Sequence, residues 1–283
     1  MSLSKAVAAL TLAASTLLSF PAGATVRDDF PSCYASLGAS SPVQPDSPAR
    51  ELFVIVDQTL NPDKEIKRSV HRQVHSFLQP GDRITLIKFS AFIANNYTDV
   101  VLKGQLDRPL STEARYDISK KLLKRFDACM KKQQVHVRKT IDQKLAVTFG
   151  REDMDIPKTE LVGNLSGLGD SVVSRSNAPR KVVLLFSDML ENSDISSFYQ
   201  SGSLKKIDAD AEISKFRKEG LLSNWGDAEV FIIGAGLMPA KYAKAYRSEN
   251  KMRPIRAFWE QYFKGSNAQL AGWGQPALLE QIR

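Results

Sequence analysis

The sequence predicts an α/β protein with a mainly parallel, doubly wound, Rossmann-like sheet that carries helices on both faces. Continuous apolar runs at 52–56, 182–186 and 230–233 are typical of strands that are buried on both sides. Segments with helical periodicity separate these runs along the chain. Because parallel strands need crossover connections, strands that alternate with helices favour a parallel sheet covered on both faces.

The N-terminus has the order of a signal peptide. Lys5 is followed by a weakly polar to apolar run over 6–20 and by small residues at Ala22 and Ala24. A membrane anchor is the less favoured alternative, because a span takes about 20 apolar residues. Later apolar runs are all interrupted by charge within about eight residues. We therefore expect residues 1–24 to be removed, leaving a periplasmic or secreted protein without a transmembrane segment.

Two cysteines, Cys33 and Cys129, remain in the mature chain. An even number in an oxidising compartment favours a disulfide between them. The alternative is two unrelated buried thiols, and a metal site made of these two alone would lack ligands. The bond would join an N-terminal arm at 25–50, which is rich in Ser, Pro, Asp and Ala, to a distant helical segment.

The ordered domain is expected over residues 51–283. Asn61 is interpreted as the N-cap of the first helix and Pro62 as its first helical residue, with Pro80 ending the helix. Further helices are expected over 112–147, from 159, over 209–219, over 255–263 and near 277. Strands are expected over 52–56, 84–89, 98–103, 181–187 and 229–234.

The helical segment at 112–147 is interpreted as a basic insertion in this domain. Its charge is most simply a solvated face, although it could also contact an acidic partner or an anionic surface. Over the whole chain, 39 Lys and Arg residues outnumber 31 Asp and Glu residues. Outside the cytoplasm this excess favours acidic proteins or anionic headgroups over nucleic acid. Nine basic residues of the insertion contribute: Lys120, Lys121, Lys124, Arg125, Lys131, Lys132, Arg138, Lys139 and Lys144.

The first strand ends in Asp57-Gln58-Thr59-Leu60-Asn61. This segment resembles the Asp-x-Ser-x-Ser motif of the von Willebrand factor type A family, and two further segments resemble other motifs of that family. The run at 182–186 ends in Ser187-Asp188, as in the family's later acidic strand end. Thr159 precedes a helix in the order of the family's threonine. The resemblance covers about residues 51–236.

This resemblance implies a metal-ion-dependent adhesion site that holds Mg²⁺ or Mn²⁺. Magnesium prefers hard oxygen ligands in octahedral geometry and keeps several waters. The sequence departs from the family at Asn61, whose side-chain oxygen is engaged elsewhere if it caps a helix. The implied ligands are Asp57, Thr59, Asn61, Thr159 and Asp188.

In the family, an acidic residue of a partner protein completes the metal's coordination. The resemblance therefore implies an exported protein–protein interaction module. A metal-free scaffold of the same fold and a metal-dependent periplasmic hydrolase are the alternatives. Because no Gly-x-Ser-x-Gly elbow and no Cys-His pairing are found, we expect a protein that is not an enzyme.

Two other patterns are interpreted as structural. His71 and His75 have the spacing of a zinc-binding pair, but no third ligand is apparent in the sequence. Gly163, Gly167 and Gly169 are interpreted as small residues for close packing, because no Lys-Ser or Lys-Thr pair follows them as in a phosphate loop.

Overall fold

The computed structural model describes residues 27–38, 43–90, 98–149, 160–200, 203–237 and 248–283. Their main feature is a six-stranded sheet of order β3-β2-β1-β4-β7-β8. All neighbouring pairs in it are parallel except β2 with β3. This confirms the predicted mainly parallel α/β architecture. The strands are β1 (Arg50–Asp57), β2 (Arg83–Phe89), β3 (Thr98–Gln105), β4 (Arg180–Phe186), β7 (Ala228–Ile233) and β8 (Ala268–Gly274).

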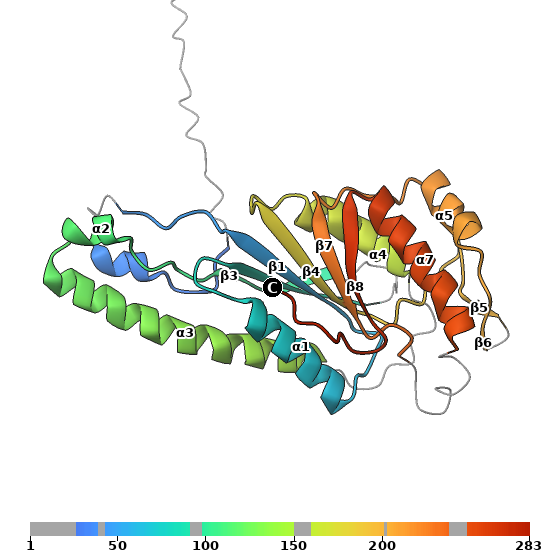
Figure 1. Cartoon of the computed structure of the whole chain (residues 1–283), viewed down its shortest axis with the longest axis horizontal. Coiled ribbons are helices and arrows are strands. Elements are labelled where there is room, and N and C mark those ends of the chain that lie inside the picture. Colours follow the sequence, from blue (N-terminus) through green and yellow to red (C-terminus); the bar gives the residue numbers. More distant parts are fainter. Residues whose placement is uncertain (1–26, 39–42, 91–97, 150–159, 201–202, 238–247) are drawn as a thin grey trace, which may run out of the picture.

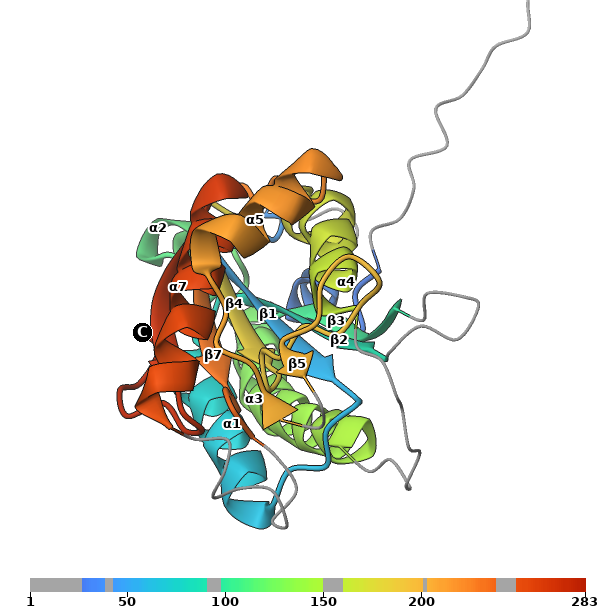
Figure 2. The same cartoon turned by 90° about the vertical axis from the view of Figure 1, so that its right-hand side faces the viewer.

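Helices cover both faces of the sheet (Figures 1 and 2). Strand β1 shows why, since Leu52 and Val54 pack with one helical layer and Phe53 and Ile55 with the other. Both sides of the strand are thus apolar, which explains its continuous apolar run. One layer holds α1 (Lys64–Phe77) and α3 (Lys120–Phe149), and the other holds α4 (Leu161–Leu168), α5 (Ala209–Lys218) and α7 (Glu249–Gly265).

The start of helix α1 differs from the prediction. Asp63 is its N-cap, and the Asp63 carboxylate accepts a hydrogen bond from the Ile66 N–H at 2.9 Å. The interpretation of Asn61 as the cap is wrong. A carboxylate at the residue just before Lys64 reaches the free N–H groups and lies at the positive end of the helix dipole.

The C-terminal region also differs from the prediction. No helix forms near Ala277; instead, β8 pairs with β7 at the edge of the sheet, and a cis peptide bond joins Gln275 to Pro276. Strand β8 contains two glycines and two alanines. These residues have low intrinsic preference for strands, so pairing with β7 decided the conformation.

The N-terminal segment packs on β3 and α3. The Asp29 N–H donates to the Lys103 carbonyl at 2.7 Å, and Cys33–Leu37 form a short 3-10 helix, η1. The predicted disulfide between Cys33 and Cys129 is confirmed. Buried Asp107 accepts hydrogen bonds from the Ser32 hydroxyl at 3.0 Å and from the Cys33 N–H. This part of the predicted arm is therefore attached to the domain at several points.

The basic segment contains α2 (Thr112–Tyr116) and α3. All nine of the basic residues named above are exposed on α3. In the described part of the chain, no helix is long and apolar enough to cross the hydrocarbon core of a bilayer. The predicted signal peptide, residues 1–24, lies outside the described residues.

Candidate functional site

The carboxyl ends of β1 and β4 bring two acidic residues into one region. The strands are parallel neighbours, with Val56 opposite Phe186, so Asp57 and Ser187 follow at the same level. The Ser187 hydroxyl donates a hydrogen bond to Asp57 Oδ2 at 2.9 Å. Ligands of open α/β sheets bind at this edge. Ser187 was not among the residues implied by the resemblance, although it directly precedes Asp188.

Asp57 is fully buried and held in one orientation. Its Oδ1 accepts the Thr59 hydroxyl at 2.6 Å and the Thr59 N–H at 2.9 Å. Burial raises the pKa of Asp57, and the hydrogen bonds from Thr59 and Ser187 oppose that rise. The structure thus brings together Asp57 and Thr59, two of the predicted ligands.

Asp188 follows on a tightly held loop. The Leu190 N–H donates to Asp188 Oδ1 and the Gly236 N–H donates to the Asp188 carbonyl, both at 2.9 Å. Met189 has a positive φ of 61°, a conformation that few residues other than glycine adopt. Burial and the charge of Asp57 together raise the pKa of Asp188 well above its ordinary value. The two carboxylates therefore repel each other when both are ionised.

The chemistry of these residues fits a hard divalent cation. Two carboxylates and the Thr59 hydroxyl offer oxygen donors of the kind that magnesium prefers. Among the described residues, no Lys or Arg side chain forms an ion pair with Asp57 or Asp188. A bound cation would supply the neutralising charge.

Of the other two predicted ligands, only Asn61 lies within the described residues. Asn61 is exposed in the connection between β1 and α1. Because Asp63 caps the helix, the Asn61 side chain is not engaged as a cap. Thr159 lies outside the described residues.

Glu191 is a further acidic residue of this region that no motif in the sequence indicates. Its side chain is 0% exposed, and burial raises its pKa to about 7. Its Oε2 accepts the Val162 N–H at the start of α4 at 2.8 Å, whereas no described residue offers a hydrogen-bond partner to Oε1. The sequence indicates little of this, since Glu191 is followed by polar residues that are typical of a solvated loop.

Solved structures share a low similarity with this chain. No family model and no curated protein matches the sequence. A similar solved structure is an aerotolerance-related membrane protein of Bacteroides fragilis NCTC 9343 with multiple mutations to serines. It is 14% identical, the match covers 77% of this chain and 88% of that chain, and the TM-score is 0.31.

Two further structures resemble the chain to a similar degree. The conserved hypothetical protein BatB of Bacteroides thetaiotaomicron is 12% identical, with 79% of this chain and 90% of that chain covered and a TM-score of 0.32. Proximal thread matrix protein 1 of the mussel byssus, solved with a zinc-occupied MIDAS motif, is 14% identical. The match covers 76% of this chain and 45% of that chain, and the TM-score is 0.32.

These identities and TM-scores are too low to assign the chain to a family or a function. The chain has a mainly parallel six-stranded sheet in which Asp57 and Asp188 lie at the ends of the neighbouring strands β1 and β4. This arrangement is consistent with the resemblance of the sequence to the von Willebrand factor type A family.

Proposed function

We propose that this chain is an exported protein–protein interaction module that binds its partner through the strand-end surface around Asp57 and Asp188. A Mg²⁺ or Mn²⁺ ion lies between the two proteins, and an acidic residue of the partner completes its coordination. The observation that carries this proposal is the pair of desolvated carboxylates at adjacent strand ends, without a basic partner in the described chain. Desolvated like charges are unfavourable unless a cation compensates them.

Each proposed ligand has a distinct role. Asp57 and Asp188 supply charge. The Thr59 hydroxyl donates a hydrogen bond to Asp57, which leaves its oxygen lone pairs for a metal. Asn61 and Thr159 are proposed to complete the protein's share of the coordination. Asn61 offers an amide carbonyl oxygen where the family has a serine hydroxyl.

Magnesium is expected to raise the melting temperature of the mature protein. At ten times its Kd, a ligand that binds only the folded state stabilises it by about 1.4 kcal/mol, or roughly 3–5 °C in Tm. Asp57→Ala removes an anchoring charge and should abolish the rise. Asn61→Ser replaces an amide with the family's hydroxyl and should enlarge it. Differential scanning calorimetry with and without magnesium measures both.

Asp117→Ala is the matched control, because it removes an exposed carboxylate from the end of α2. It should leave the magnesium effect unchanged. Identical melting curves with and without millimolar magnesium, in the wild type and in Asn61→Ser, would contradict the cation site. The fold would then be a metal-free scaffold that binds its partner without a cation.

Export to the periplasm, or secretion, is part of the proposal. The order of Lys5, an apolar run and small residues at Ala22 and Ala24 supports it, as does a disulfide, which persists in oxidising compartments. The intact mass of the protein recovered from the periplasm should match a chain that begins at Thr25. Recovery of a soluble cytoplasmic protein that still carries residues 1–24 would contradict it.

The exposed face of α3 is proposed as a secondary contact surface. Nine exposed Lys and Arg residues share the helix with only two acidic residues, Asp127 and Asp142. Such a face attracts an acidic protein or an anionic surface, and the attraction weakens as salt rises.

A further inference from the structure

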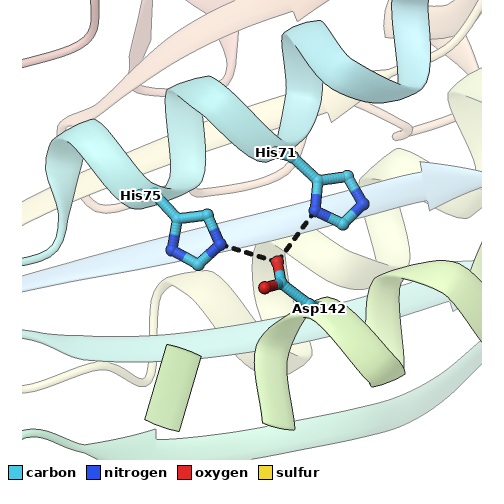
Figure 3. A group of neighbouring side chains, drawn as sticks. All are labelled: His71, His75 and Asp142. Carbon is cyan, nitrogen blue, oxygen red and sulfur yellow. Dashed lines mark hydrogen bonds and ion pairs between the residues drawn. The ribbon is translucent and has the colours of Figure 1, made fainter. Parts of the chain in front are cut away.

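His71, His75 and Asp142 form a compact group between α1 and α3. The two histidines are one helical turn apart on α1, and Asp142 reaches them from α3 (Figure 3). Asp142 Oδ1 lies 3.0 Å from His71 Nδ1 and 2.7 Å from His75 Nε2. No third ligand for this pair is apparent in the sequence. The structure supplies one from a residue 67 positions beyond His75.

These side chains form a ligand set that transition metals favour. Two imidazoles and one carboxylate are typical ligands of zinc sites that keep one coordination position open. One ligand atom of each residue lies within 4.8 Å of the others. Tetrahedral bonds of about 2.0–2.1 Å place neighbouring ligand atoms roughly 3.3 Å apart, so the N···O distances need to lengthen by only a few tenths of an ångström.

The surroundings allow this adjustment and leave the site accessible. The side chains of His71, His75 and Asp142 are 28%, 24% and 51% exposed, so they can rotate without disturbing the core. His75 also borders a cleft of about 210 Å³ between the two helices. Arg138 lines the same cleft, so its charge favours an anion as a fourth ligand.

We propose that His71, His75 and Asp142 form a zinc-class divalent metal site that fastens α3 to α1, with water or an anion in the fourth position. Imidazole nitrogens select zinc over magnesium, which prefers oxygen ligands. The site is separate from the strand-end carboxylates and does not depend on the proposed function. It anchors the C-terminal half of α3, while the Cys33–Cys129 disulfide anchors the N-terminal half.

Isothermal titration of the mature protein with Zn²⁺ tests this site. The titration uses the Asp57→Ala background, so that the strand-end carboxylates do not contribute. We expect one zinc ion per chain, with binding weakened at least about 100-fold by His75→Ala or Asp142→Asn, since even residues that only orient metal ligands contribute about 10–100-fold. Cobalt(II) should give the visible absorption of a site with nitrogen and oxygen ligands.

His136→Ala is the matched control, because His136 is the remaining histidine of the chain and is exposed on the same helix. This variant should bind zinc with a Kd within about twofold of that of the protein that keeps His136, a difference of less than about 0.5 kcal/mol. Zinc should also slow hydrogen exchange in α3 of the His136→Ala protein but not of His75→Ala. Absence of zinc binding near neutral pH, or equal affinity in His75→Ala and His136→Ala, would overturn the proposal. The group would then be only a hydrogen-bonded contact between helices.

Discussion

Removal of the disulfide by a Cys33→Ala, Cys129→Ala double substitution is expected to lower the free energy of unfolding by about 2–4 kcal/mol. The two cysteines are 96 positions apart, so the bond closes a long loop in the unfolded chain. For such a loop the chain-entropy contribution is about 4–5 kcal/mol, which is an upper value. Tm should fall by roughly 5–15 °C, as measured by calorimetry.

The loss of stability should be concentrated in η1 and in the first half of α3, which the disulfide joins. Without the bond, η1 is still held by contacts such as the Tyr34 hydroxyl to the Arg108 carbonyl at 3.1 Å and the packing of Tyr34 on Phe126. The sheet itself does not depend on them. Hydrogen exchange should therefore accelerate in η1 and the first half of α3 before it does in β1 and β4.

A reducing agent provides the control for the disulfide prediction. It should destabilise the wild type and leave the double variant unchanged. Equal denaturation midpoints for the oxidised wild type and the double variant would show that the bond contributes nothing to stability.

The second large effect concerns the buried carboxyl of Glu191 and depends on pH. Burial raises its pKa from about 4.5 to about 7 in the folded protein. Between these values the unfolded chain releases a proton that the folded protein keeps, so the free energy of unfolding falls as pH rises. The loss reaches about 3 kcal/mol above pH 8. Glu191→Gln cannot ionise and should remove this loss.

Denaturation of the wild type and Glu191→Gln at a series of pH values measures the difference. The two stability curves should run parallel below about pH 4.5 and separate steadily up to about pH 8, where the variant gains most. A separation that does not change with pH would show that the Glu191 carboxyl has the same pKa in the folded protein as in the unfolded chain.

Glu212 is the matched control, because it is also buried but has basic neighbours. Burial acts to raise its pKa, but hydrogen bonds from Lys215 and Ser196 lower it below the ordinary value. Its ionised form therefore stabilises the fold above the pKa of the unfolded chain. As pH rises through the acidic range, the stability of Glu212→Gln should therefore fall relative to that of the wild type. The stability of Glu191→Gln should instead rise relative to the wild type.

The buried core of the fold could be predicted from local patterns. The runs in β1, β4 and β7 are apolar on both faces, and this alone indicates central strands of a parallel sheet. Strand β8 could not be found in this way, because its residues are small and its conformation depends on β7. The cap of α1 was misplaced by two residues, since Asn61 and Asp63 are both good N-caps in sequence terms.

The candidate sites could likewise be predicted only in part from the sequence. Asp57 and Asp188 could be expected at one edge, because each follows a predicted central strand. Their mutual repulsion and the support from Ser187 depend on β1 and β4 being neighbours in register. Glu191 looks solvated in sequence, but in the fold its carboxyl is buried and accepts a hydrogen bond from the Val162 N–H of α4.

By itself, the sequence determined the α/β class, the central strands and the acidic strand ends, and it favoured the pairing of Cys33 with Cys129. These follow from side-chain periodicity and from the number of cysteines, which are properties of short segments or of composition. Only the tertiary structure decided that Asp142 meets His71 and His75, and that a carboxyl at Glu191 loses its water. Both depend on where α3 and α4 dock, and docking is set by apolar surface summed over whole helices and strands rather than by any local motif.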